Sequence, residues 1–221
     1  MGVQCDLVPV VVMGACGTGK SRIGQALADR LGRKFLDGDD FHPKANKEKM
    51  ARGTPLEDED RAPWLEAIAC EIGARLERGE AVVFACSALK RRYREVLCSR
   101  APSTVFVHLS GSEVWVPCCC NAVADVQRRL MTNKELIGER LRGRSHEFMD
   151  PRLLASQLAA LEPLQQDERH VIADISRAPQ DIVSCIAQEL MALLPVAKGG
   201  QSAVKAPVSL GHCIAFLCPC V

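Results

Sequence analysis

The sequence predicts an α/β fold in which helices cover both faces of a five-stranded parallel sheet, giving three layers. Five short apolar runs alternate with stretches of helical periodicity along the 221 residues. Such alternation is typical of parallel sheets with right-handed crossovers. The first apolar run also leads into a glycine-rich segment and then a helix, which is the context of a phosphate-binding loop. We expect one domain over residues 1–195, followed by a disordered tail over 196–221.

The glycine-rich segment, residues 14–21, reads Gly-Ala-Cys-Gly-Thr-Gly-Lys-Ser and fits the P-loop pattern. A strand-type run over 8–13 precedes it, and helical periodicity over 22–31 follows it. Its glycines let backbone N–H groups turn toward a phosphate, and the helix start adds its positive dipole end. Lys20 supplies a charge for the outer phosphates, and Ser21 offers a hydroxyl to Mg²⁺. The pattern therefore predicts a P-loop NTPase fold with an ATP site made of Gly14, Ala15, Cys16, Gly17, Thr18, Gly19, Lys20 and Ser21.

Composition indicates a globular protein, and the local clustering of its basic residues points to small anionic ligands. Hydrophobic residues make up 48% and charged residues 25%, and the net charge of +1 gives no global attraction to nucleic acid or membranes. Asp6 interrupts the N-terminal segment, so we expect no signal peptide, and no apolar run is long enough for a bilayer. Of the 12 cysteines, Cys70, Cys86 and Cys185 fall in core elements and are expected to be small buried hydrophobes. We expect a cytoplasmic, reducing compartment without disulfides, and no metal site at 118–120.

Acidic side chains follow the second predicted strand, residues 34–37. The segment reads Asp37-Gly38-Asp39-Asp40-Phe41-His42-Pro43. Ligands of open α/β sheets bind at the carboxyl ends of strands, so these carboxylates are expected beside the P-loop. One of Asp37 and Asp39 can support Mg²⁺ while the other faces an acceptor hydroxyl. Taken alone, the segment fits a solvated turn better, because Asp and Gly are common turn residues.

The remaining elements follow in order. They are helical stretches over 46–51 and 57–76, a strand over 81–86, a basic cluster over 87–94 that opens a helix, strands over 104–109 and 170–175, and helices over 136–141, 153–161 and 179–194. The region 38–66 is longer than an ordinary strand–helix connection, so we expect it to bind the acceptor. A solvated basic face is the usual explanation of such a cluster, but its place after a wholly apolar, central strand makes anion binding a stronger alternative. His108 lies within a strand and is expected to pack in the core.

Arginines follow the predicted helix at 136–141. Arg140, Arg142 and Arg144 lie in a segment that would close over a triphosphate and exclude water. The alternative is an exposed basic helix end, which the helix dipole also favours.

Several segments together resemble the gluconokinase family of small P-loop kinases. They are 14–21, 35–43, 46, 49–50, 53, 55–56, 58, 60–61, 63–65, 86–90, 93–94, 107–111, 140–141, 144, 146, 148–149, 153–154, 156–157 and 161–163. Residues 37–65 are the most specific of these, and shikimate kinases resemble them less. The resemblance implies the strand order 2-3-1-4-5 and a mobile lid over 134–150.

The resemblance also implies ATP-dependent phosphorylation of D-gluconate at its 6-hydroxyl, giving 6-phosphogluconate for the pentose phosphate route. On this basis Asp39 accepts the hydroxyl proton, Lys20 neutralises the transferred phosphoryl, and Ser21 with Asp37 supports Mg²⁺. The acceptor's hydroxyls and carboxylate are gripped by Asp39, His42, Arg61, Lys90 and Arg94, and ATP is also bound by Arg140 and Arg144 of the lid. Which arginine meets the carboxylate is left open, and a homodimer is expected at the family level. The alternatives are a kinase of another small hydroxy acid such as shikimate, or a non-catalytic ATP-binding regulator.

Two segments depart from the family pattern. Residues 113–133 are inserted between the fourth strand and the lid, and we expect the kinase to work without them. The tail at 196–221 ends in Cys-Pro-Cys-Val, a poor prenylation signal because the middle residues are not aliphatic.

Overall fold

The computed structural model describes residues 7–110 and 151–193. The predicted insert, lid and tail, with Arg140 and Arg144, lie outside these residues. The elements are β1 (Val10–Met13), α1 (Lys20–Leu31), β2 (Lys34–Asp37), a 3₁₀ helix η2 (Gly38–Phe41), α2 (Lys44–Ala51), α3 (Asp58–Glu77), β3 (Val82–Ala85), α4 (Arg91–Cys98), β4 (Val105–Ser110), α7 (Pro151–Ala160), β5 (His170–Asp174) and α8 (Pro179–Leu193).

The five strands form one parallel sheet in the order β2-β3-β1-β4-β5, which confirms the predicted fold and strand order. β1 lies at the centre, with Val10 paired to Val83 of β3 and to Val105 of β4. All four residues of β1 are buried. The P-loop therefore leaves the middle of the sheet, between the ends of β3 and β4.

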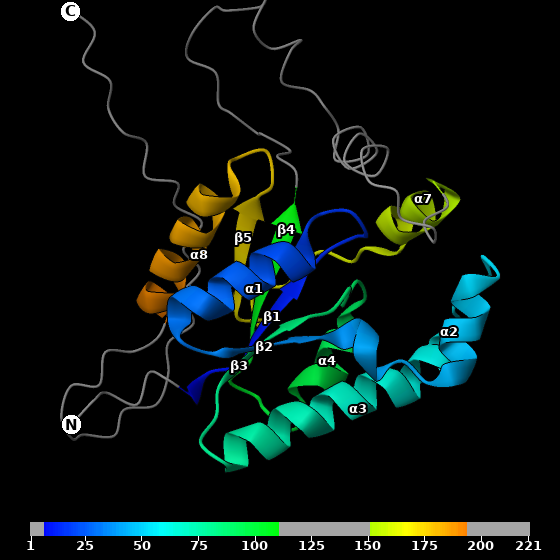
Figure 1. Cartoon of the computed structure of the whole chain (residues 1–221), viewed down its shortest axis with the longest axis horizontal. Coiled ribbons are helices and arrows are strands. Elements are labelled where there is room, and N and C mark those ends of the chain that lie inside the picture. The colour runs from blue at the N-terminus through cyan, green and yellow to red at the C-terminus, as the bar shows by residue number, and fades with distance from the viewer. Residues whose placement is uncertain (1–6, 111–150, 194–221) are drawn as a thin grey trace, which may run out of the picture.

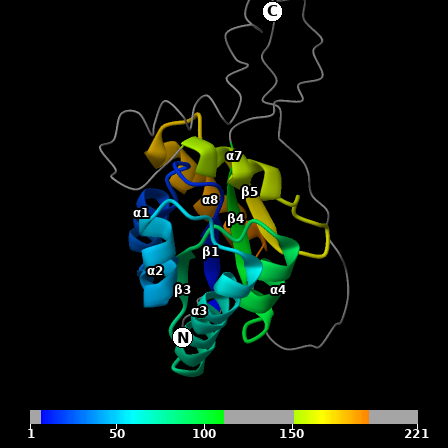
Figure 2. The same cartoon turned by 90° about the vertical axis from the view of Figure 1, so that its right-hand side faces the viewer.

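Helices cover both faces of the sheet (Figures 1 and 2). Because adjacent strand residues point to opposite faces, β1 contributes to two cores. Val10 and Val12 pack with α1 and α8, whereas Val11 and Met13 pack with α3 and α4. In Figure 1, α2 and α7 extend beyond the sheet on the side of the P-loop.

The structure differs from the sequence-based expectations in three places. The segment after β3 remains non-helical until Arg91, and Ala88 there has a φ of 44°, in the left-handed region. Residues 38–41 form a 3₁₀ helix that the sequence pattern did not indicate. Cys70 is exposed rather than buried, because it lies on the solvent side of α3, while Cys86 is buried and Cys185 half-buried.

Cys16, Cys70, Cys86 and Cys98 of the described segments are free thiols. Among the helices of these segments, none has the length and apolarity that crossing a membrane requires.

Candidate active site

The P-loop adopts a curled backbone that favours glycine at three of its positions. Gly14, Gly17 and Gly19 have φ values of 142°, 80° and 97°, and a Cβ on Gly14 would lie 2.9 Å from the Leu109 carbonyl oxygen. α1 begins directly after Gly19, so its free N–H groups and positive dipole end face the loop. This arrangement suits a polyphosphate.

The Lys20 side chain folds back over the loop. Its Nζ donates to the Ala15 carbonyl at 3.0 Å, and the Thr18 hydroxyl donates to the same carbonyl at 2.9 Å. Burial lowers the pKa of Lys20, while the nearby Asp39 and Asp37 carboxylates oppose that shift. An anionic phosphate beside the ammonium would favour its charged form further.

Ser21 and Asp37 lie together, as the sequence predicted. The Ser21 hydroxyl donates to Asp37 Oδ2 at 2.6 Å, and Asp37 Oδ1 accepts from the Asp39 N–H at 3.1 Å. A hydroxyl and a carboxylate oxygen fit Mg²⁺, which takes one or two protein oxygens and completes its shell with phosphate and water. Within residues 7–110 and 151–193, no cluster of three His, Cys, Asp or Glu side chains that could hold a metal ion is present.

Asp39 follows Asp37 by two residues and presents its carboxylate to the open side of the site. Its side chain is 83% exposed. Partial desolvation and the adjacent Asp37 charge raise the pKa of Asp39, and Lys20 opposes the shift. Solvent screening limits the size of such a shift at this exposure. The direction is the one that a group accepting a hydroxyl proton needs.

His42 is buried beside Asp39 and is neutral. Its ring stacks on Trp64 with centroids 4.1 Å apart, and burial together with the Arg61 charge lowers its pKa to about 4. The Asn46 Nδ2 group lies 3.4 Å from His42 Nδ1 and donates to the Asp60 carbonyl at 2.7 Å. Since an amide N–H₂ only donates, Nδ1 accepts and Nε2 carries the proton. That Nε2–H lies 3.9 Å from Asp39 Oδ1, where it can serve an acceptor hydroxyl.

Trp64 holds the acidic segment at residues 37–40 through a hydrogen bond to its backbone. Its indole N–H donates to the Gly38 carbonyl at 2.7 Å in a buried contact. A Cβ on Gly38 would lie 2.5 Å from the Ala85 carbonyl oxygen, so the 3₁₀ helix lies close against β3. Trp64 and Gly38 therefore hold Asp37 and Asp39 in place.

Three cations surround the Tyr93 ring. The charged atoms of Arg61, Lys90 and Arg92 lie 5.9, 5.6 and 5.5 Å from its centroid. Arg61 and Lys90 were predicted from the sequence, and Arg92 was not. The run of basic residues that begins at Lys90 was the sequence signal that could have indicated Arg92. The fold is needed to show which side chains of that run lie against Tyr93. We call Asp58, Arg61, Lys90, Arg92 and Tyr93 the Tyr93 cluster.

Arg94 does not join the other predicted acceptor residues. Its guanidinium is 1% exposed and pairs with Glu168 at 2.5 Å, and it donates to the carbonyls of Ala88, Leu89 and Glu162. Protein acceptors thus occupy its donors, and an acceptor carboxylate has no access to it. The expectation that Arg94 grips the acceptor does not fit this geometry, which instead makes it a support for the residues before Lys90.

Gln157 was also missed by sequence reasoning. Its side-chain oxygen, on α7, accepts from the Cys16 backbone N–H at 2.7 Å. No local pattern links residues so far apart, although residues 156–157 belong to the resembling segments. His108, by contrast, is half-buried in β4, where burial lowers its pKa to about 4.

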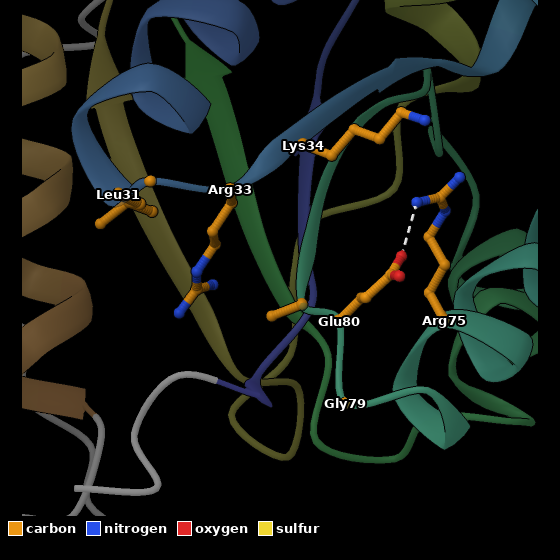
Figure 3. A pocket seen from close by; sticks show the side chains of 8 residues that line it. Leu31, Arg33, Lys34, Arg75, Gly79 and Glu80 are labelled. Atoms are coloured by element: carbon orange, nitrogen blue, oxygen red, sulfur yellow. Dashed lines mark hydrogen bonds and ion pairs between the residues drawn. The ribbon is translucent and has the colours of Figure 1, made fainter. Parts of the chain in front are cut away.

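A cavity of about 630 Å³ lies at the other edge of the sheet, where β2 and β3 begin. Arg33, Lys34, Arg75 and Glu80 line it, with Arg75 paired to Glu80 (Figure 3). Arg33 donates to the Val8 carbonyl. Two of the three cations that line the cavity, Arg33 and Arg75, therefore already have protein partners. The cavity also lies away from the P-loop.

Comparisons with known proteins agree with this site. The family model for shikimate kinase matches residues 16–191. A gluconokinase of Arabidopsis thaliana is 41% identical over 184 residues, covering 81% of this chain and 90% of its own. A gluconokinase of Gluconobacter oxydans is 40% identical over 167 residues, covering 75% and 82%. The chain belongs to the gluconokinase family. The crystal structure of a gluconokinase from Sinorhizobium meliloti, 36% identical, covers 86% of this chain and 94% of its own with a TM-score of 0.70.

Membership of the gluconokinase family makes this chain a kinase, with ATP as the phosphoryl donor and a small molecule as the acceptor. In the described residues, Ser21 at the end of the P-loop contacts Asp37, and Asp39 and His42 lie beside Asp37.

Proposed function

We propose that this protein transfers the terminal phosphoryl group of ATP to the 6-hydroxyl of D-gluconate, giving 6-phospho-D-gluconate. The observation that carries the proposal is the placement of Arg61. Its charge acts on His42, beside Asp39, and its guanidinium also lies 5.9 Å from the Tyr93 ring. A cationic cluster thus adjoins the carboxylate that would receive a hydroxyl proton. Gluconate carries its carboxylate and its terminal hydroxyl at opposite ends of one six-carbon chain, which suits this layout.

The chain's own residues account for the transfer. Asp39 orients the 6-hydroxyl and accepts its proton as the oxygen attacks the terminal phosphorus, and the O–P bond to ADP breaks on the far side. Lys20 and the P-loop N–H groups stabilise charge on the transferred phosphoryl. His42 Nε2–H holds a hydroxyl of the acceptor, and the Tyr93 cluster holds its carboxylate.

Ser21 and Asp37 are the residues we propose to hold Mg²⁺ beside the phosphates, in line with their 2.6 Å contact. The ion, when bound, would neutralise charge on the transferring phosphates. We assign the lid to residues 134–150, with Arg140 and Arg144 as further ATP contacts. We also propose a homodimer that works in the cytoplasm, a reducing compartment that suits the free thiols of the described segments.

The test is a coupled assay of ADP release with gluconate, shikimate or the neutral polyol D-glucitol as acceptor. Asp39→Asn removes the proton acceptor with little change of shape, so kcat should fall by about 10²- to 10⁴-fold. Asp40→Asn is the matched control, because Asp40 is its exposed neighbour and lies outside the proposed machinery. Absence of gluconate turnover by the wild-type protein, or full activity of Asp39→Asn, would overturn the proposal. Turnover of shikimate alone would favour the shikimate alternative.

A further inference from the structure

Asp58 is the first residue of α3 and the one carboxylate of the Tyr93 cluster. Both of its oxygens accept from Lys90 Nζ, at 3.0 and 3.1 Å. It also accepts from Arg92 and from the Tyr93 hydroxyl. One internal carboxylate therefore occupies donors of three side chains that surround the proposed place of the acceptor's carboxylate.

We propose that Asp58 is a built-in competitor for the carboxylate of the acceptor, and so determines how strongly this site prefers anionic over neutral acceptors. The inference rests on the proposed function, because it takes the Tyr93 cluster as the carboxylate end of the acceptor site. In the free protein Asp58 holds Lys90 and Arg92. A bound acceptor carboxylate shares or takes over their donors.

Burial and charge both support an exchange. The side chains of Lys90 and Asp58 are 26% and 32% exposed, and that of Arg92 is 55% exposed. Ion pairs at this depth are weak enough to be replaced, because solvent still screens them. The three cations and one carboxylate of the cluster carry a net charge of +2, so an anion is still attracted while Asp58 repels it.

Arg61 differs from the other two cations. In the described part of the chain its guanidinium lies over the Tyr93 ring, and the ion pairs of Asp58 there are with Lys90 and Arg92. We therefore infer that an entering carboxylate meets Arg61 first and then draws Lys90 and Arg92 from Asp58. A neutral polyol brings no charge with which to compete and leaves these pairs intact.

The test measures dissociation constants for gluconate and D-glucitol by titration calorimetry, together with KM and kcat for gluconate. Asp58→Asn keeps the shape and removes the competing charge. We expect gluconate to bind about three- to tenfold more tightly, as removal of one unit charge several ångströms away implies, with D-glucitol unchanged. Glu59→Gln is the matched control, because it removes one charge from the same exposed first turn of α3, outside the cluster; it should change neither constant.

Asp58→Ser carries the same expectation and covers the case in which Asp58→Asn fails to fold. Weaker gluconate binding by both neutral variants would overturn the inference, since Asp58 would then organise the cations rather than compete. An equal change for gluconate and D-glucitol would overturn it too. In either case gluconate turnover by the wild-type protein would leave the proposed function standing. A wild-type protein that neither binds nor phosphorylates gluconate would overturn both.

Discussion

The backbone N–H of Cys16 in the P-loop donates a hydrogen bond to the side-chain oxygen of Gln157 on α7, over 2.7 Å. The contact joins the donor loop to a helix 141 residues away in sequence. Leu154 of the same helix is buried in the core that includes Ala15 and Cys16. α7 thus supports the P-loop by packing and by one polar contact.

Replacement of Gln157 should therefore affect ATP more than the acceptor. Gln157→Glu keeps an oxygen acceptor but adds a negative charge beside the phosphate loop, so we expect KM for ATP to rise about tenfold. Gln157→Leu leaves the Cys16 N–H without its partner, and a loss of about 1 kcal/mol should raise KM for ATP several-fold. KM for gluconate should change less in both variants.

Steady-state kinetics with each substrate varied in turn checks this, with Gln188→Glu and Gln188→Leu as controls on the exposed side of α8. Equal effects on the two substrates would show that Gln157 supports the fold in general rather than the donor loop.

Gly38 is the second position where a small change should have a large effect. A Cβ there would lie 2.5 Å from the Ala85 carbonyl oxygen. The residues on either side of Gly38 are Asp37 and Asp39, the two acidic residues of the site. Gly38→Ala must push the 3₁₀ helix away from β3, at about 1–3 kcal/mol. We expect kcat to fall at least about tenfold, because an ångström-scale displacement of Asp39 impairs its alignment.

Gly53→Ala is the control for Gly38→Ala. Gly53 has a φ of 71° but open space around it, so its replacement should cost about 1 kcal/mol of stability through the backbone alone. Urea unfolding and kcat measured on both variants separate the two effects. Wild-type kcat in a folded Gly38→Ala protein would contradict the positioning role.

The sequence predicted those parts of the site that depend on short-range patterns. All five strands were found within two residues of their predicted bounds, and the Ser21–Asp37 pair followed from two strands ending at the same edge. The 3₁₀ helix and the Asn46–His42 contact were not predictable, because they depend on how Trp64 packs beneath the segment.

Arg94 shows why basic residues are hard to assign from a sequence. Its partner Glu168 is 74 residues away, and no local pattern indicates that pairing. One signal in the sequence did indicate that Arg94 faces inward. Leu97 lies three residues further along α4, so the two side chains share one face of the helix, and both are buried. Acidic or basic character alone does not separate a side chain that faces a ligand from one that closes a buried ion pair.

Two histidines, the buried His42 and the half-buried His108, should make stability depend on pH. The pKa values of His42 and His108 are both lowered from 6.5 to about 4, chiefly by burial. Between these values the unfolded chain binds more protons than the folded one, so stability rises with pH over this window and is fully present above about 6.5. On acidification from pH 7 toward 4, each histidine should cost on the order of 2–3 kcal/mol.

Urea unfolding at several pH values from 7 to 4.5 checks the histidine effect. His42→Phe keeps an aromatic ring against Trp64 and cannot titrate, so its loss of stability on acidification should be smaller than that of the wild-type protein. His108→Phe should reduce the loss in the same way, and the double variant further. An unchanged slope in all three variants would contradict the assignment.

Arg94 and Glu168 should form the most costly pair to break. The Arg94 side chain is 1% exposed and that of Glu168 11%, and the guanidinium also holds carbonyls of Ala88 and Leu89, just before Lys90. Arg94→Met leaves a buried carboxylate without its cation, and we expect a loss of about 3–5 kcal/mol in the free energy of unfolding. Glu168→Gln should lose less, because the amide oxygen can still accept from Arg94. Arg91→Met, which breaks exposed pairs on the same helix, should change stability little.

The same pair distinguishes support from direct binding. If Arg94 only supports the turn at Ala88, Glu168→Gln should raise KM for gluconate. The rise should follow the loss of stability of the variant, because Glu168 itself does not contact the acceptor. If Arg94 binds the acceptor directly, Glu168→Gln should free its guanidinium and leave or lower that KM. Steady-state kinetics on variants first shown by circular dichroism to be folded decides between these outcomes. A lowered KM for gluconate in Glu168→Gln would show that Arg94 binds the acceptor, as the sequence predicted.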